Sequence, residues 1–259
     1  MKNIIHTVTR AQMQANSRRT LVTLIGVVLS VAMLTAVFAG ADSFLNLLYR
    51  QATQENGTWH GRAFETGERV VQNLSQDDRV DQLGLAASWG MFPLDDQNRW
   101  GAALYGVNQS FYQLLGVECL EGTLPTKENE LAITQTLAEK TGCKLGEQVS
   151  LDLLRVWTPQ GVDSTGATTY RQTSGLGIMG LSDSYVIHSL GENQFTITAI
   201  VDPGGFDGQN VLTWEPCFTV LGDQVPPDGL WCAYYTVDPL GQKLYDLMED
   251  VQNWQAGLP

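Results

Sequence analysis

The sequence predicts an α+β protein in which one long N-terminal transmembrane and stalk helix precedes a mixed extracytoplasmic α+β domain. Three observations predict this class. The 21 residues from Leu21 to Ala41 contain no charged residue, His, Asn or Gln. Strand-like and helix-like segments then interleave without a regular βαβ repeat. Seven Trp, eight Tyr and eight Phe supply the apolar area of a core, and about 215 residues suffice for one large domain or two subdomains.

The apolar run from Leu21 to Ala41 is long enough to cross a bilayer, which takes about 20 residues. Its final Ala39-Gly40-Ala41 is of the kind that signal peptidase cuts, but a signal core usually has only about 7–15 residues. The apolar pattern also continues through residues 44–48 without a breaker. We therefore expect a retained helix from Asn16 to about Gln54, with cleavage after Ala41 as the alternative.

The basic residues before the span set its expected orientation. Lys2, Arg10, Arg18 and Arg19 precede Leu21, with no acidic residue among them. The positive-inside rule then places this end in the cytoplasm, with Arg18 and Arg19 at the membrane boundary. The expected organisation is a cytoplasmic segment (1–20), a transmembrane helix with the start of a stalk (21–48) and an extracytoplasmic domain (49–259) at the cell membrane.

The outer part of the chain is acidic and contains all four cysteines. Subtracting the four basic residues before the span from 15 leaves 11 against 28 acidic residues. This charge repels phosphate, so nucleic acid is not an expected partner. In an oxidising compartment the cysteines are possible disulfide partners, and three pairings stay open. The four residues are Cys119, Cys143, Cys217 and Cys232.

Local patterns predict several elements of the domain. Residues 58–64 and 99–108 are typical of strands and residues 67–76 of a short helix. Residues 109–115 predict a two-turn helix that ends at Gly116.

The segment 120–153 predicts a strand, a short helix and a second strand. Thr134 is the expected N-cap of the helix and Gly142 its end. Residues 157–193 are rich in Gly, Ser and Thr and predict a polar insertion with one strand near 184–190. Residues 194–203 predict a further strand.

The last segment predicts an amphipathic helix that packs on the sheet. Asp238 is the expected N-cap and Pro239 the first helical residue. The apolar face is formed by Leu240, Leu244, Leu247, Met248, Val251 and Trp254.

Motifs that resemble catalytic or binding signatures lack the context their chemistry requires. The G-x-G-x-x-G of residues 175–180 has neither a buried strand before it nor a helix after it. Lys140-Thr141-Gly142 has no accompanying S-x-x-K, and residues 180–184 lack the second glycine of a nucleophile elbow. Residues 202–210 lack the oxygen ligands of a calcium loop. We therefore predict no enzyme, no catalytic, cofactor-binding or metal-binding residue, and no cofactor.

Three segments, quoted as they stand, resemble a known family. They are "YGVNQSFYQLLGVECLEGTLP", "NELAITQTLAEKTGCKLGEQVSL" and "QFTITAIVDP". With the preceding span they resemble the extracytoplasmic core domain of MacB/FtsX-type ABC transporter permeases, and residues 105–156 and 194–203 carry the resemblance.

The resemblance implies a type VII ABC system. In such a system a dimer of permeases is driven by a cytoplasmic ABC ATPase, and the first helix transmits motion to the outer domain (mechanotransmission). The outer domain would act on a peptide, a lipoprotein or a cell-wall-related substrate. Because such permeases have three further helices, a chain that stops at Pro259 is expected to be a fragment. A stand-alone single-pass sensor or binding protein is the alternative, and a secreted enzyme is a third hypothesis.

Overall fold

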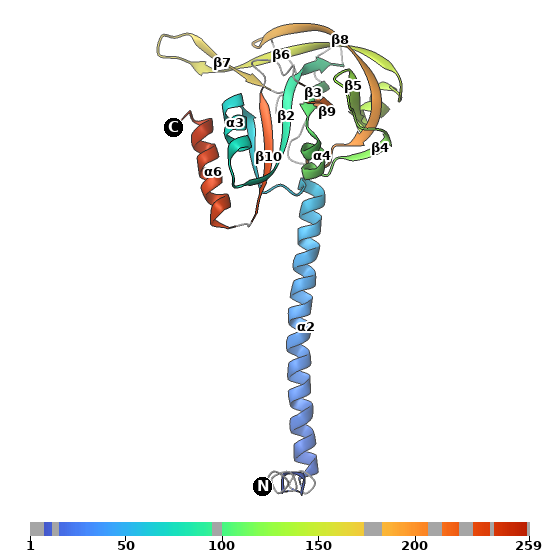
Figure 1. The fold of residues 1–259 in the computed structure, drawn as a ribbon, viewed down its shortest axis with the longest axis vertical. Coiled ribbons are helices and arrows are strands. Elements are labelled where there is room, and N and C mark those ends of the chain that lie inside the picture. The colour runs from blue at the N-terminus through green and yellow to red at the C-terminus, as the bar shows by residue number, and fades with distance from the viewer. Residues whose placement is uncertain are drawn as a thin grey trace. The chain divides into compact units, whose positions relative to one another are not determined.

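The computed structural model describes residues 8–11, 16–94, 100–173, 183–206, 214–222, 230–238 and 241–257. The chain divides into two compact units, Met1–Ala52 and Thr53–Pro259. The first unit contains most of one long helix, and the second contains a large mixed sheet with its helices (Figure 1).

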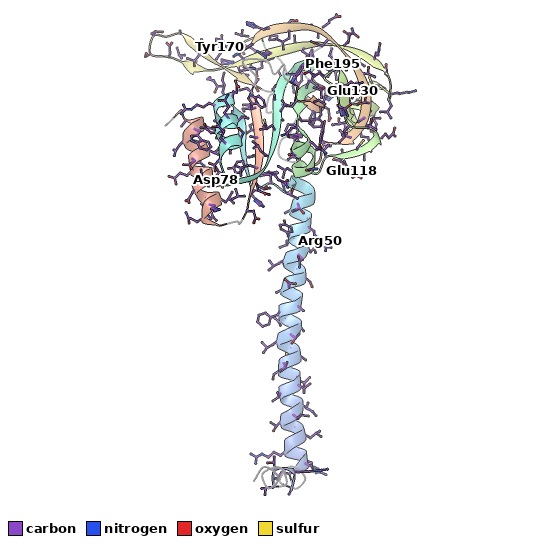
Figure 2. The ribbon with its side chains drawn as sticks, viewed as in Figure 1. Arg50, Asp78, Glu118, Glu130, Tyr170 and Phe195 are labelled. Atoms are coloured by element: carbon purple, nitrogen blue, oxygen red, sulfur yellow. The ribbon has the colours of Figure 1, made fainter. Side chains whose placement is uncertain are left out.

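The long helix is α2 (Ser17–Asn56), which confirms the predicted continuous helix. Among the described residues it is the one helix that is long and apolar enough to cross a membrane. Side chains project from it all round (Figure 2). The hydroxyls of Thr23, Ser30 and Thr35 each donate to the carbonyl four residues earlier, at 3.0, 2.8 and 2.9 Å. These polar groups are therefore satisfied inside the helix, as a lipid environment requires.

The second unit contains ten described strands. They are β1 (Gly61–Thr66), β2 (Val80–Pro93), β3 (Gly101–Val107), β4 (Glu118–Gly122), β5 (Glu130–Thr134), β6 (Gln148–Val162), β7 (Thr168–Thr173), β8 (Val186–Asp202), β9 (Trp214–Val220) and β10 (Trp231–Val237). The helices are α3 (Glu68–Gln76), α4 (Gln109–Leu115), α5 (Gln135–Thr141), the 3₁₀ turn η1 (Gly204–Phe206) and α6 (Gln242–Gln255).

The strands form one mixed sheet in the order β1-β10-β2-β3-β9-β5-β8-β6-β7, with β4 beside β8. Strand β6 also pairs with β2, through Leu154 and Met91. The six strands from β2 to β6 along this path therefore form a closed ring of pairings. Four strands lie outside the ring: β7 pairs with β6, β4 pairs with β8, and β10 and β1 extend the sheet beyond β2. Strands β1 and β10 contact α3, and β1 also contacts α6.

Two hydrophobic clusters cover opposite sides of the ring strands. On β3 the side chains of Ala103 and Tyr105 join one cluster, and those of Ala102 and Leu104 join the other. All seven residues of β3 are buried, so this strand lies in the middle of the domain. Helix α4 completes the first cluster and α5 the second. A third cluster holds α3 and α6 on the β1–β10 pair.

The predicted ends of the two short helices at Gly116 and Gly142 and the predicted cap at Thr134 are confirmed, and the structure adds a cap at Asn108. Asn108 caps α4, which ends at Gly116 in the left-handed region with φ of 64°. Thr134 caps α5, which ends at Gly142 with φ of 75°. In both helices a side-chain oxygen satisfies an unpaired amide at the start, and glycine adopts a backbone conformation that other residues disfavour.

The predicted start of the last helix is wrong. Helix α6 begins at Gln242 after Gly241, whose φ of 131° interrupts the helical path, so Asp238 is not its N-cap. The apolar face is confirmed in part: Leu247 and Val251 are buried, and Leu244 and Trp254 pack against the third cluster, whereas Met248 is exposed. Residues 239–240 lie outside the described part of the chain.

The stretch 157–193 contains more strand than predicted. Strand β6 continues to Val162, β7 forms a hairpin with it, and β8 begins at Val186. Tyr170 lies on this hairpin (Figure 2). Most hairpin side chains are exposed on both faces, so the stretch lacks the apolar alternation by which a strand is recognised.

Replacing Asn108 by Ala should destabilise the domain by about 3 kcal/mol. The Asn108 side chain accepts from the amides of Phe111 and Leu85, at 3.0 and 2.9 Å, and donates to the Leu83 carbonyl at 2.9 Å. The substitution removes the cap of α4 and its tie to β2 together. Chemical denaturation followed by tryptophan fluorescence measures the loss. The exposed Asn129→Ala is the matched control, and equal stability of the two variants would contradict the prediction.

Candidate coupling site at the end of the stalk helix

The last turn of α2 belongs to the domain unit, because the boundary between the units lies at Ala52 and Thr53. Gly57 ends the helix with φ of 85°, and its amide donates to the Thr53 carbonyl at 2.9 Å. A residue with a side chain would be strained in this conformation. The helix therefore stops at one fixed position within the domain.

The end of α2 lies directly against the end of α4. The amide of Thr58 donates to the Leu114 carbonyl at 2.6 Å, and the Thr58 hydroxyl lies 3.4 Å from the same oxygen. A Cβ added to Gly57 would clash with that carbonyl and lie 2.8 Å from the Leu115 Cα. The contact is thus between two backbones, with no side chain between them.

The turn η1 closes the other side of the junction. A Cβ at Gly205 would clash with the Asn56 carbonyl group, and one at Gly204 would clash with the Leu115 carbonyl oxygen. Gly204 also has a φ of 56°. The Asp202 carboxylate accepts from the Gly204 amide at 2.8 Å and orients the turn. We name the backbone of residues 53–58, 114–116 and 204–206 the junction.

Trp59 ties the junction to the sheet. Its indole Nε1 donates to the Asn56 carbonyl at 2.5 Å, which satisfies one of the last carbonyls of the helix. Its ring meets Tyr234 of β10 edge-on, with centroids 5.7 Å apart. The Arg62 guanidinium lies 5.7 Å from the centre of the same ring. Burial raises the pKa of the Tyr234 phenol, so this group stays neutral at physiological pH.

Phe206 connects the junction to the core. Its ring packs on Tyr105, Phe111, Phe218 and Tyr234, with centroid separations of 5.1, 5.2, 5.8 and 6.3 Å. These partners come from β3, α4, β9 and β10, so one side chain in the turn contacts four elements of the domain. Movement of the turn would therefore disturb the packing of the core.

The family of the chain follows from a comparison of its sequence with family models. The model of the MacB-like periplasmic core domain matches residues 20–220. The chain belongs to this family. It is a membrane protein with an extracytoplasmic domain of the kind found in ABC transporter permeases.

Solved structures with detectable similarity include a periplasmic region and an extracellular domain. The periplasmic region of MacB from Actinobacillus actinomycetemcomitans is 9% identical, with a TM-score of 0.43, and the match covers 76% of this chain and 77% of that one. The extracellular domain of the noncanonic ABC-type transporter YknZ from Gram-positive bacteria is 13% identical, with a TM-score of 0.38, and the match covers 74% and 93%. No curated protein matches the chain.

Of the residues that the sequence suggested for a site, only the segment 202–210 contributes to the junction of this MacB-like domain, through Gly204–Phe206, whereas Arg18, Arg19 and the two histidines of the domain, His60 and His188, are not part of it. Arg18 and Arg19 are exposed in the first turn of α2, in the other unit. The Nδ1 of His60 accepts from the Val237 amide at 3.0 Å, and His188 packs on Trp157 with ring centres 4.8 Å apart. The G-x-G-x-x-G of residues 175–180 lies outside the described residues. Among the described residues no group of three or more His, Cys, Asp or Glu side chains is arranged to hold a metal ion.

None of the four cysteines forms a disulfide in the structure. Cys119 is exposed, Cys143 is half-buried, and Cys217 and Cys232 are buried. Cys217 and Cys232 belong to different clusters of the core. Burial raises the pKa of the Cys232 thiol to about 12, so it behaves as a small apolar group.

Sequence reasoning did not identify the junction. Its only local signals are glycines: Gly57, shortly after the predicted end of the long helix, and Gly204 and Gly205, within residues 202–210. Neither signal shows that the two backbones meet, because that contact joins residues almost 150 positions apart.

Replacing Gly205 by Ala should loosen the junction at a cost of about 1–3 kcal/mol, because the new methyl group must push away the Asn56 carbonyl. Hydrogen exchange measured by mass spectrometry should become faster at residues 57–59. Gly67→Ala is the matched control, since an added Cβ there meets no atom within 4 Å. Unchanged exchange in Gly205→Ala would show that this contact does not hold the helix end.

Proposed function

We propose that the chain is the membrane-anchored part of an ABC transporter permease whose outer domain relays ATP-driven motion or handles substrate outside the membrane. In this proposal α2 is the lever, the junction passes its motion on, and the domain acts on a peptide, a lipoprotein or a cell-wall-related substrate without catalysing a reaction. A cytoplasmic ABC ATPase and a second permease subunit are the proposed partners.

The observation that carries the proposal is the direct attachment of the helix end to the domain. With about 1.5 Å of rise per residue, the 40 residues of α2 measure about 60 Å, roughly twice the hydrocarbon core of a bilayer. A flexible linker at the end of such a helix would absorb its motion. Instead the helix stops at Gly57, against the backbones of α4 and η1.

Chemistry at the residues with known catalytic counterparts has little support. Lys140, Thr141 and Gly142 form the end of α5, and the Lys140 ammonium lies 3.4 Å from the Glu215 carboxylate. The Nδ1 of His60 is occupied by a backbone amide. These residues have structural partners, which supports a role in binding or relaying motion.

The proposed orientation places Arg18 and Arg19 inside the cell and the domain outside. An impermeant maleimide applied to intact right-side-out vesicles should therefore modify the exposed Cys119 within the MacB-like domain. An Ala11→Cys variant should react at the new site only after detergent is added. Peptide mapping by mass spectrometry reads both sites, and the buried Cys217 serves as the unreactive internal control. Labelling of residue 11 in sealed vesicles would refute the orientation.

The proposed partnership is tested at the locus and in the membrane. We expect the complete reading frame to encode three further apolar helices, or an ABC ATPase gene to lie beside it. The tagged full-length product, purified from its own membranes, should retain an ATPase with a Walker A motif, identified by mass spectrometry. An isolated frame that ends at Pro259, with no ATPase gene nearby and none co-purifying, would instead favour the single-pass sensor.

A further inference from the structure

A groove runs along helix α5 and meets the junction at Gly204, which lines one of its two hollows. Two hollows form it, of about 360 and 580 Å³, and both are lined by Gln135 and Glu139 of α5. Each hollow lies in the range of ligand pockets, about 300–1,000 Å³, and the two adjoin at Gln135 and Glu139, so a compact small molecule would fill only one of them. An extended chain suits such a groove better.

The larger hollow has an apolar lining. Leu120 of β4, Ala138 of α5 and Ile200 of β8 contribute to it. The Leu120 side chain is 42% exposed, and Leu145, whose side chain approaches Gly122 of β4, is 39% exposed. Glu118 marks β4 in Figure 2. Of these two apolar side chains, Leu120 lines the groove and stands open to solvent.

The smaller hollow has an acidic lining. Glu139, Asp202 and Glu215 line it, together with the hydroxyl residues Thr134 and Thr136. Hydrogen bonds orient all three carboxylates.

Glu139 accepts from the side-chain amide of Gln135 at 2.8 Å, and Asp202 accepts from the backbone amide of Gly204 at 2.8 Å. Glu215 accepts from the Thr134 hydroxyl at 3.1 Å. Lys140 neutralises Glu215, at 3.4 Å, but Glu139 and Asp202 add net negative charge.

The larger hollow adds one carboxylate, Glu121, and one lysine, Lys144, so the groove as a whole stays negative. An occupant that complements both ends must carry a positive charge beside an apolar side chain.

Resting on the proposed function, we infer that this groove binds a cationic amphipathic peptide segment in extended form, with an apolar side chain near Leu120 and a basic one near Glu139 and Asp202. A peptide is favoured over a free amine because the apolar and acidic ends belong to two successive hollows. The same chemistry specifies the substrate class that the outer domain would handle.

The position of the groove gives the peptide a route to the junction. Residues 201–204 line the acidic hollow, and Gly205, the next residue, lies against the Asn56 carbonyl. Asp202 also holds the amide of Gly204. A basic side chain that binds Asp202 would therefore act on the residue that orients the turn under the helix end.

The test measures binding of a defined peptide to the full chain. A fluorescein-labelled Lys-Leu-Lys-Leu-Lys-Leu amide is titrated against the protein in phosphatidylcholine nanodiscs, with empty nanodiscs as blank and fluorescence anisotropy as readout. We expect saturable binding that weakens with added salt. Glu139→Gln should weaken it about five-fold, Leu120→Ser about ten-fold, and the two together more than either alone.

Matched controls lie on α6, away from the groove. Glu249→Gln and Met248→Ser alter an exposed acid and an exposed apolar side chain there, and both should bind like the wild type. A Glu-Leu repeat should not bind, and a Lys-Ser repeat should bind at least ten-fold more weakly than Lys-Leu. Thermal unfolding of each variant shows that it is folded.

Several outcomes would overturn the inference. They are equal binding of the Lys-Leu and Glu-Leu repeats, equal binding of the groove and control variants, and displacement of the peptide by millimolar calcium alone, which would indicate a simple cation site. Each outcome can occur while the ATPase still co-purifies, so the peptide-binding inference can fail while the proposed function still holds.

Discussion

The structure depends on a contact between backbones at the end of the stalk helix. Gly57, Gly204 and Gly205 carry no side chains, so the end of α2 lies directly against the Leu114 carbonyl of α4 and against Gly205 of the η1 turn, and Gly204 lies against the Leu115 carbonyl. Side chains can change rotamer to absorb a shift, whereas packed backbones cannot without moving the elements they belong to. Any displacement of the helix end must therefore move α4, the turn, or both.

Helix α4 is the element through which this constraint reaches the sheet. It has only seven residues, too few to be stable alone, so its position is set by its contacts. Asn108 fixes its start to β2, its buried side chains fix its face to the core, and the Leu114 carbonyl fixes its end to Thr58. The same short helix thus belongs to the junction and to the aromatic cluster around Phe206, which makes the two one mechanical unit.

The sequence predicts those elements whose signals are local. The cap at Thr134, the left-handed glycines at positions 116 and 142 and the apolar face of α6 each follow from neighbouring residues, and each is present. Strands β2, β9 and β10 were not predicted, because they are buried on both faces and lack alternation. The two glycines Gly84 and Gly90 would suggest turns within β2. At Gly84, however, the missing side chain allows the α4 backbone to approach the strand closely. The junction and the groove are assembled from segments distant in sequence, so no local pattern could reveal them.

Strand β8 links the groove and the junction through consecutive residues, and this limits what either can do to the other. A ligand can shift the position of the turn only by the difference between its affinities for the two positions. This coupling is reciprocal: if binding in the groove favours one position of the turn, a helix movement that displaces Gly205 must change the affinity of the groove by the same factor. Coupling of a few-fold to about a hundred-fold corresponds to about 1–3 kcal/mol, which is comparable to the cost of disturbing one tight backbone contact. Under the proposed function, one such contact between Gly205 and Asn56 would suffice to couple ligand binding in the groove to the last turn of α2.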